Sequence, residues 1–396
     1  MNILLLSFYY EPDLCAGSFR NTALVRSLRK SMNSGDSIDV LTTMPNRYHS
    51  YSQSADARET DGMVTINRIP LPEHKSGFSD QVWSFRAYYG QVWNYLKRNH
   101  KHYDMVVASS SRLFTAYLGS RVAKRLKAPL YLDIRDIFTD TLDDVLKNRL
   151  VKAGLLPALR KLEKSTIQSA DHLNLVSGGF EKYFRKFYSG PVSEFTNGID
   201  NEFFDYEFKS STNNPVPVVT YAGNIGQGQG LEKIIPEAAA QLSGKFQFKV
   251  IGDGGTRKAL VSELDKRGVT NVELVDPVDR EKLKEHYSDS DYLFLHLNDY
   301  DAFKKVLPSK IFEYAATGKP LIAGVSGYSA EFIRNNVENH ILFSPCNADE
   351  LVRKLKKNSL KSTPRNDFAD KYRRDNIMDR MADSIMQCAI AKNGVS

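Results

Sequence analysis

Lys310 and Glu313 stand three positions apart in the segment "PSKIFEYAATGKPLIAGV", and together they have the chemistry to hold a phosphate and a ribose. Pro308 suits the first turn of a helix and Gly318 suits its end, so the spacing places both charged side chains on one helical face. A lysine there can neutralise a phosphate, and a carboxylate can accept hydrogen bonds from two ribose hydroxyls. An ordinary ion pair within the helix is the alternative interpretation.

A glycine-rich turn comes earlier in the chain. The segment "YAGNIGQGQGLEKII" follows the apolar run "VPVVT" and leads into residues with helical spacing. Turns of this kind hold phosphates because uncovered N–H groups and the helix N-terminus point at the anion. It is no P-loop, since Leu231 follows the last glycine, and it misses the G-x-G-x-x-G spacing. The candidate contacts are Gly223, Asn224 and Gly226, with Gly252 in the loop "IGDGG".

Two loops in the N-terminal half are further candidates. In "CAGSFR", Gly17 leaves the backbone uncovered and Ser18 is the expected N-cap, so the following helix can offer N–H groups to an anion. Any strand-to-helix loop can contain Gly and Ser, which is the alternative. In "YLDIRDIFTDT", Asp133, Arg135 and Asp136 stand together at the end of a strand and can orient a substrate or handle a proton. A structural salt bridge is the alternative there.

Two D-x-D patterns, at 289–291 and 299–301, raise the question of a metal-dependent reaction. The pattern is weak, and "SDSDYLFLHL" is typical of a residue run that caps a helix and opens a strand. The eight histidines show no ligand spacing such as H-E-x-x-H. We therefore expect no metal ligands and no bound cofactor.

The elements that must position these residues follow from length and patterning. With 396 residues, 41% hydrophobic and 26% charged, the chain is expected to be a soluble protein of two domains. A net charge of +7 is modest for this length, which excludes a dedicated nucleic-acid-binding block. Three scattered cysteines favour a reducing compartment, and the start "MNILLLSFYYEP" is typical of a first strand, so we expect a cytoplasmic protein.

Strand-length apolar runs alternate with helical stretches along the chain. The predicted strands are "ILLLSF", "IDVLTT", "VTINRI", "MVVASS", "PLYLDI" and "HLNLV", then "VPVVTYAG", "FQFKVIG", "NVELVD", "YLFLHL", "PLIAGV" and "ILFSP". Runs without polar alternation indicate parallel sheets covered by helices on both faces. The sequence predicts an α/β protein of two Rossmann-like, doubly wound domains facing a central cleft, with ligands beyond the carboxyl ends of the strands.

The predicted boundaries follow composition. Residues 1–207 form the first domain, and "FKSSTNNPVP", 208–217, is polar and proline-bearing and is the expected linker. Residues 218–375 form the second domain, and 376–396 form a helix expected to cross back to the first.

One aromatic segment, 78–103, holds both tryptophans and is expected to be helical with a stripe of Val82, Phe85, Tyr89, Val92 and Leu96. Core packing is one interpretation of this stripe, and docking at a membrane interface is the other, since Arg and Lys flank the aromatics. A basic run near 352–374 is either a solvated helical face or a contact for an anionic surface.

The chain resembles the family 4 retaining glycosyltransferases of GT-B fold, and most closely the branch that builds bacterial surface polysaccharides. The resemblance lies in "TNGID" at 196–200, "YAGNIGQGQGLEKII", "VIGDGG" and "PSKIFEYAATGKPLIA", in this order and spacing. It implies that the C-terminal domain binds a nucleotide-sugar and the N-terminal domain an acceptor. Glu313 would be the second glutamate of the E-x7-E motif, which holds the ribose.

This chain departs from the family pattern at three positions. Lys305 replaces the first glutamate of the motif, so the usual sugar contact does not carry over, and Asp301, Lys304 and Lys305 are expected near the donor sugar. Asn224 and Gln229 stand where many relatives have an Arg and a Lys on the diphosphate. Neutral amides contribute less than cations, so helix N–H groups, Lys310 and one of Arg20, Lys304 or Arg257 should compensate.

The "DIRDIFTDT" segment resembles the branch's R-D-x-W-P segment, which places Asp133, Arg135 and Asp136 in the acceptor region as candidate catalytic residues. The resemblance implies a retaining, metal-independent hexosyl- or acetamidohexosyltransferase. Its donor would be a nucleoside-diphosphate-sugar, with UDP as the expected nucleotide, and its acceptor a polyprenyl-diphosphate-linked or oligosaccharide chain at the inner membrane face. The alternatives are a UDP-sugar 2-epimerase of the same fold, a non-catalytic nucleotide-sugar-binding protein, and a dehydrogenase using Asp253.

Overall fold

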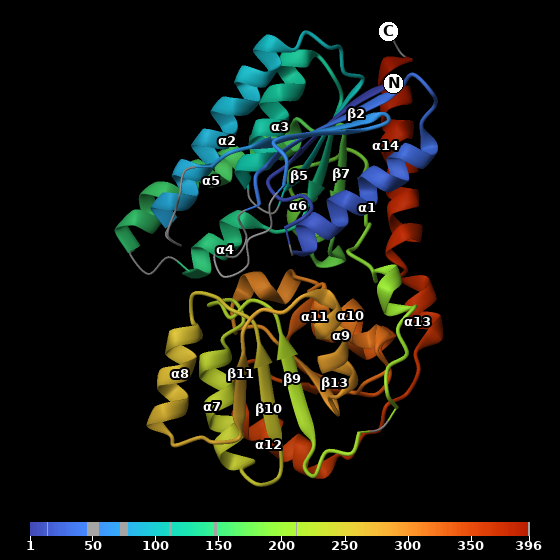
Figure 1. Cartoon of the computed structure of the whole chain (residues 1–396). Helices are drawn as coiled ribbons and strands as arrows, with labels where there is room; N and C mark the ends of the chain where they lie inside the picture. Colours follow the sequence, from blue (N-terminus) through green and yellow to red (C-terminus); the bar gives the residue numbers. More distant parts are fainter. Residues whose placement is uncertain are drawn as a thin grey trace. The chain divides into compact units, whose positions relative to one another are not determined.

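The strands form two separate sheets, one in each of two units. The computed structural model describes residues 1–13, 15–45, 55–71, 78–110, 113–145, 149–210 and 212–394. Unit 1 comprises Met1–Asn197 and Arg374–Ser396, and unit 2 comprises Gly198–Arg373. In each, helices cover the sheet on both faces (Figure 1).

The sheet of unit 1 runs in the order β3-β4-β2-β1-β5-β6-β7-β8. Its strands are parallel except β3, which pairs antiparallel with β4. The connection reverses direction between β1 and β5, which is the topological switch point of this unit. The bounds are β1 Asn2–Ser7, β2 Ser37–Thr43, β3 Arg58–Asp61, β4 Val64–Ile69, β5 Met105–Ser110, β6 Leu130–Ile134, β7 His172–Leu175 and β8 Val192–Ser193.

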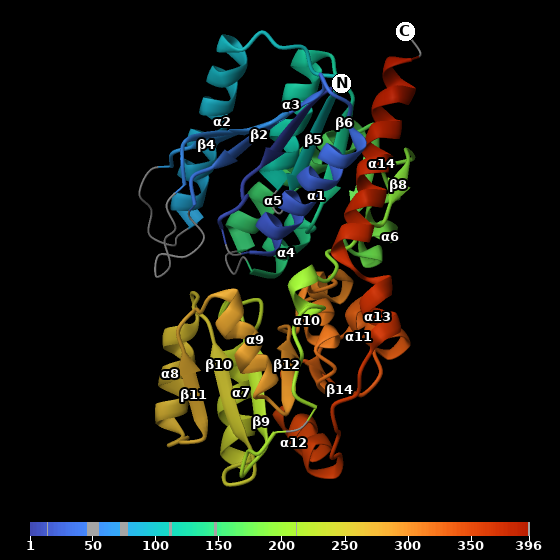
Figure 2. The same ribbon diagram turned by 45° about the vertical axis from the view of Figure 1, so that its right-hand side comes forward.

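The two faces of β6 meet different helices of unit 1. Leu130 and Leu132 pack toward Gly119 of α3, whereas Tyr131 bonds Ser384 of α14 and Asp133 bonds Arg20 of α1. Helices α1 and α14 lie side by side in both ribbon views (Figures 1 and 2). The bounds are α1 Ala16–Ser31, α2 Phe78–Arg98, α3 Leu113–Leu126, α4 Phe138–Val145, α5 Arg149–Gln168, η1 Gly178–Phe180, α6 Glu181–Phe184 and α14 Arg374–Asn393.

The sheet of unit 2 is parallel throughout, in the order β11-β10-β9-β12-β13-β14. Its switch point lies between β9 and β12. The two strands are neighbours, and the loops that follow them lead to opposite sides of the sheet. The bounds are β9 Val218–Ala222, β10 Gln247–Ile251, β11 Val272–Val275, β12 Tyr292–His296, β13 Leu321–Gly324 and β14 His340–Phe343.

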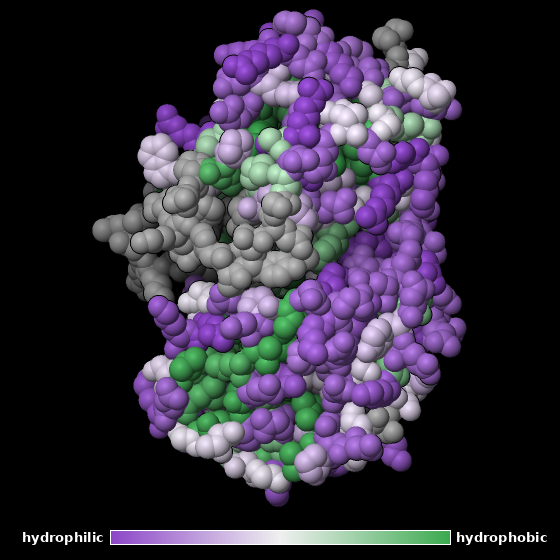
Figure 3. Space-filling model, viewed as in Figure 1, coloured by the Kyte–Doolittle hydropathy of each residue, from purple (hydrophilic) through white to green (hydrophobic). Residues whose placement is uncertain are grey.

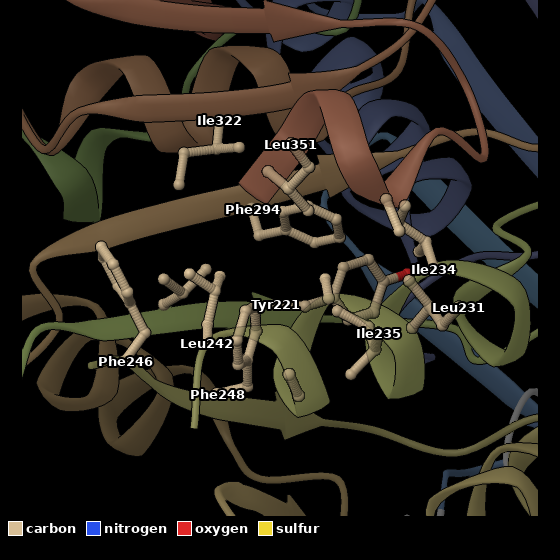
Figure 4. Packing of buried hydrophobic residues seen from close by; sticks show 14 of the residues in the cluster. Tyr221, Leu231, Ile234, Ile235, Leu242, Phe246, Phe248, Phe294, Ile322 and Leu351 are labelled. Atoms are coloured by element: carbon tan, nitrogen blue, oxygen red, sulfur yellow. The ribbon is translucent and has the colours of Figure 1, made fainter. Parts of the chain in front are cut away.

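Two apolar cores sandwich this sheet. On one face α7, α8 and α12 pack on the strands, with Leu351 beside Phe294 and Leu231 beside Ile234 and Ile235 (Figure 4). On the other, α9, α10, α11 and α13 surround a core rich in Phe and Tyr. The bounds are η2 Asn201–Phe203, α7 Leu231–Gln241, α8 Arg257–Lys266, α9 Arg280–Ser288, η3 Asp301–Lys305, α10 Lys310–Ala316, α11 Gly327–Asn336, α12 Ala348–Lys357 and α13 Asn366–Lys371.

The α/β class with two doubly wound sheets is confirmed, and all twelve predicted strands are present. The sequence analysis missed β3 and β8. The sequence of β3, "RETD", is polar because this edge strand is largely exposed, and β8 has only two residues. Neither carries an apolar run that would mark a strand.

The predicted boundary between the domains was wrong. Residues 198–217 belong to unit 2, since the N–H of Ile199 donates to the Tyr372 carbonyl at 2.8 Å. The expected linker at 208–217 is anchored to unit 2 as well. The N–H of Lys209 donates to Ser288 at 3.0 Å, and Asn214 donates to Asp291 at 2.9 Å. The C-terminal helix α14 begins at Arg374 and belongs to unit 1.

The aromatic segment forms α2, and its two interpretations apply to different faces. Tyr88 and Val92 are fully buried, while Phe85 and Tyr89 are half-buried; the side chain of Val82 lies outside the described residues. Trp83 is 62% exposed, with the Arg86 guanidinium 5.5 Å from its ring centre. Helix α14, by contrast, presents a mostly hydrophilic outer side (Figure 3). Within the described part of the chain, no helix has the length and apolar content to cross a bilayer.

Candidate active site

The loops after β9 and β10 pack backbone against backbone. Gly223 and Gly252 each have a φ of +136°, and a side-chain carbon on Gly252 would collide with the Gly223 carbonyl. The N–H of Gly223 donates to the Ile251 carbonyl at 2.8 Å, and that of Ile225 donates to Asp253 at 2.9 Å. Both positions therefore need glycine, and the loop after β9 has a fixed start.

Lys310, the first residue of α10, lies over this loop. Its Nζ occupies the space that a side chain on Gly223 would fill, and it lies 5.7 Å from the centre of the Tyr221 ring. The ammonium group is thus held at the carboxyl end of β9, at the switch point of the sheet. The structure brings together the predicted donor residues Gly223, Gly252 and Lys310.

The end of β12 clamps the glycine-rich turn. Asn298 donates from its side chain to the Gln227 carbonyl at 2.9 Å and from its N–H to the Gly228 carbonyl at 2.8 Å. The His296 Nδ1 lies 2.6 Å from the Gln229 carbonyl, and its Nε2 accepts from the N–H of Cys346 at 2.8 Å. Three successive carbonyls are therefore turned toward β12.

His296 is a neutral structural residue. It is fully buried, and burial lowers the pKa of its imidazole to about 4. Its two bonds require a proton on Nδ1 and a lone pair on Nε2. The sequence analysis missed both His296 and Asn298. Their only signal was polar side chains at the end of an otherwise apolar strand.

Hydrogen bonds within the turn decide which of its N–H groups can meet an anion. Those of Gln229 and Gly230 are already used, since both donate to the Gly226 carbonyl, at 3.0 and 3.3 Å. Those of Asn224, Gly226, Gln227 and Gly228 have no acceptor within the residues that the structure describes. Together with the first turn of α7, these groups are the donors of the turn that remain for a phosphate.

The two amides that replace the family's cations bond each other. The Asn224 Nδ2 donates to the Gln229 Oε1 at 2.9 Å, and this bridge passes where a side chain on Gly226 would lie. Gln229 therefore shapes the turn. Of the proposed compensating cations, Arg257 instead pairs with Asp276 at 2.9 Å.

Glu313 lies one helical turn beyond Lys310 and is half-buried. The guanidinium of Arg280, at the start of α9, attracts its charge. The predicted sugar-side residues lie in η3, where Asp301 and Lys304 form an exposed ion pair at 2.5 Å and Lys305 is half-buried. Gly327, with a φ of +60°, packs against the Lys304 carbonyl and ties η3 to α11.

In unit 1 the structure separates the three predicted catalytic residues. Asp133 is fully buried, and its carboxylate accepts two hydrogen bonds from Arg20, each at 2.8 Å, one from Ser109 at 3.0 Å and one from Asn174 at 2.7 Å. Despite the opposing effect of burial, the Arg20 guanidinium and these bonds hold its pKa below the ordinary value. Every lone pair is used, so Asp133 is a core residue and its catalytic assignment was wrong. Arg20, fully buried, cannot serve the diphosphate either.

Arg135 lies over the N-terminus of α1. Its guanidinium covers Gly17, with Cζ 3.2 Å from where a side-chain carbon would stand, and its buried Nε has no hydrogen-bond partner among the described residues. Burial lowers the pKa of Arg135, and the nearby Asp133 carboxylate opposes this. The N-cap of α1 is Cys15, and the predicted cap, Ser18, is buried within the helix.

Asp136 turns to the other side of the sheet, beside α4. The Thr141 hydroxyl donates to its Oδ1 at 3.3 Å. Burial raises the pKa of its carboxyl to about 6, and the buried Glu163 nearby adds to the rise. Glu163 itself accepts from Thr139 at 2.8 Å and from Tyr183 at 2.5 Å, which fixes the first turn of α4 against α5 and α6. Asp136 can therefore exchange a proton near neutral pH.

The D-x-D carboxylates serve other partners. Asp289 pairs with Lys209 at 2.6 Å, Asp291 accepts from Asn214 and from the N–H of Val218, and Asp301 pairs with Lys304. No group of three or more His, Cys, Asp or Glu side chains in the described ranges is arranged to hold a metal ion.

Comparisons with known proteins agree on the class of protein. Residues 202–375, most of unit 2, match the family model described as glycosyl transferases group 1. The chain is 22% identical over 350 residues to the colanic acid biosynthesis glycosyl transferase WcaI of Escherichia coli K12, covering 83% of this chain and 84% of that one.

Solved glycosyltransferases share the fold. Sucrose-phosphate synthase of Thermosynechococcus elongatus has a TM-score of 0.68 at 14% identity, covering 100% of this chain and 98% of that one. Anabaena HepE, solved with UDP-glucose, gives 0.65 at 14% identity, with 98% and 100% covered. WaaG, a glycosyltransferase of lipopolysaccharide biosynthesis, gives 0.62 at 14% identity, with 98% and 99% covered. Residues 202–375 therefore match the group 1 glycosyl transferases, and the whole chain shares the GT-B fold of these solved glycosyltransferases.

The raised pKa of Asp136 predicts a pH-dependent stability. The unfolded chain releases this proton near pH 4 and the folded chain near pH 6, so the free energy of unfolding falls between these values. Asn at position 136 does not titrate, so this decrease should be absent in Asp136→Asn. Above pH 6 the free energy of unfolding of Asp136→Asn should exceed that of wild type by roughly 1–3 kcal/mol, and at pH 4 the two should be equal. Urea titrations from pH 4 to 8 measure this. Asp383→Asn, an exposed change in the same unit, should follow wild type; an Asp136→Asn curve parallel to wild type would refute the shift.

Proposed function

We propose that this protein is a retaining, metal-independent transferase that moves a hexosyl or acetamidohexosyl group from a nucleoside-diphosphate-sugar, with UDP as the nucleotide, to a lipid-linked or oligosaccharide acceptor. The reaction would serve bacterial surface polysaccharide synthesis at the cytoplasmic face of the inner membrane. One observation carries the donor assignment: the Lys310 ammonium lies over Gly223, at the start of a turn whose Asn224 and Gly226 N–H groups have no acceptor among the described residues. A cation and two N–H donors at a switch point suit a diphosphate.

These groups also suit the chemistry of the bond that breaks. As the sugar leaves, negative charge grows on the diphosphate, and donors fixed in advance stabilise it better than water does. Lys310 is fixed by α10, and the turn is fixed by Asn298 and His296, so little reorganisation is needed. Glu313 would accept the ribose hydroxyls, and η3, with Asp301, Lys304 and Lys305, would lie toward the sugar.

Unit 1 would bind the acceptor. Arg135 at the N-terminus of α1 can hold an anionic or hydroxyl group, and Gly17 leaves room for its guanidinium. Asp136 has a pKa suited to proton exchange. Retention fits a front-face reaction in which the donor phosphate helps to remove the acceptor proton.

A product assay tests the reaction class. Purified protein with a UDP-sugar and a polyprenyl-diphosphate-linked saccharide should form glycosylated lipid in excess EDTA at a rate close to that without it, and NMR should show the donor's anomeric configuration retained. Conversion of the donor without an acceptor would indicate an epimerase. Binding without any product would indicate a non-catalytic binding protein, and loss of product in EDTA would refute metal independence.

The donor assignment predicts unequal roles for two residues. Lys310→Ala removes a charge-assisted contact and should weaken UDP binding about tenfold or more in calorimetry. Gln229→Ala breaks only the bond to Asn224 and should weaken binding less. Lys282→Ala, an exposed lysine of α9, is the control. Equal losses for Lys310→Ala and Gln229→Ala would contradict the assignment.

Membrane contact through α2 would bring the enzyme to a lipid-linked acceptor. The exposed Trp83 beside Arg86, with Lys97 and Arg98 further along α2, combines an aromatic anchor with basic groups. Trp83→Ala should reduce cosedimentation with vesicles containing anionic phospholipid about tenfold. Ile390→Ala, equally exposed at 62%, is the matched control. Equal binding by Trp83→Ala and wild type would exclude α2 as the anchor.

A further inference from the structure

Arg280, at the start of α9, lies among three carboxylates of unit 2. Its Nη2 donates to Asp200 at 2.9 Å, and its Nε bonds Glu202. The charge of Glu313 also acts on it, and the Tyr287 ring of α9 lies 5.3 Å from the Tyr314 ring of α10, the helix that carries Glu313. The Arg280 side chain is 19% exposed, and the Phe203 ring centre lies 5.4 Å from its Cζ. The Arg280 guanidinium is therefore packed against Phe203 and held by Asp200 and Glu202, while the Glu313 carboxylate attracts it.

The partners of Arg280 come from well-anchored elements. Asp200 and Glu202 lie in the segment that starts unit 2, and this segment is tied to Tyr372 by the Ile199 N–H. Asp279 caps α9 by accepting from the N–H of Lys282 at 2.8 Å. A planar guanidinium fixed in this way offers a directed positive charge, which a flexible lysine would not.

Glu313 needs such support because of its surroundings. It projects from α10 near the phenols of Tyr287 and Tyr314, which are both fully buried. A glutamate side chain has several rotatable bonds, and accepting two adjacent ribose hydroxyls requires one orientation of its carboxylate. A cation on one flank restricts this orientation before the ligand arrives, which increases affinity by lowering the cost of ordering.

We propose that Arg280 is the positioning residue that sets the Glu313 carboxylate for the ribose hydroxyls of the donor, with Asp200 and Glu202 holding Arg280 in place. This inference rests on the proposed function of Glu313. It gives a role to Asp200 of the "TNGID" segment, which the donor contacts had left unexplained. Arg280 touches no reacting atom in this account.

The test separates the ribose contribution from the phosphate contribution. Calorimetry gives the Kd of UDP, 2′,3′-dideoxyuridine diphosphate and UMP for wild type, Arg280→Gln, Arg280→Lys and Lys282→Gln. Wild type should bind the dideoxy compound at least about tenfold more weakly than UDP, as expected for hydrogen bonds to a charged group. In Arg280→Gln the ratio of the Kd of the dideoxy compound to the Kd of UDP should fall toward one. The ratio of the Kd of UMP to the Kd of UDP should stay as in wild type. Arg280→Lys should be intermediate, and Lys282→Gln should match wild type.

The other outcomes each identify what fails. An Arg280→Gln protein that keeps the full dideoxy penalty, or one in which both ratios collapse together, overturns the positioning role. A wild-type protein that binds UDP with no dideoxy penalty overturns the ribose role of Glu313, and this inference with it. A wild-type protein that does not bind UDP overturns the proposed function itself. Thermal unfolding of each variant confirms that the comparison is between folded proteins.

Discussion

The carbonyl of Gly223 lies against the Cα of Gly252, with no room for a side-chain carbon between them. This close approach is possible because neighbouring parallel strands end at the same edge of the sheet, and two glycines with positive φ turn the chain there. The proposed contacts with the diphosphate depend on it. It sets where the turn after β9 begins, which leaves the space over Gly223 for Lys310 and leaves the N–H groups of Asn224 and Gly226 uncovered.

Unit 1 shows the opposite use of charge. Arg20 and Asp133 are fully buried and satisfy each other, and Arg20 also donates to the carbonyls of Phe195 and Thr196. Removing one partner of such a pair leaves a buried charge, at a typical cost of about 3–5 kcal/mol. The pair joins α1, β6 and the segment after β8 that leads into unit 2. Arg135 and Asp136, just beyond it, diverge to opposite faces of the sheet.

Local patterns predicted what depends on local chemistry. Apolar runs predicted the strands, the glycines predicted the turn, and Pro308 with Gly318 predicted the limits of α10, which runs from Lys310 to Ala316. Asp133 could not be told from Asp136 in this way, because its partner Arg20 lies 113 residues away. The clamp of His296 and Asn298, and the grouping of Arg280 with Asp200, Glu202 and Glu313, also arise only when distant segments meet. The edge strand β3 was missed because solvent exposure allows it a polar sequence.

The central claim is that a nucleoside diphosphate binds unit 2 at the end of β9, held by Lys310 and the backbone of the glycine-rich turn. A crystal structure of the protein with UDP tests it most directly. We predict a phosphate oxygen within hydrogen-bond distance of the Lys310 Nζ and another on the N–H of Asn224 or Gly226, with the ribose hydroxyls on Glu313. A diphosphate bound elsewhere, with Lys310 still lying over an empty turn, would contradict it.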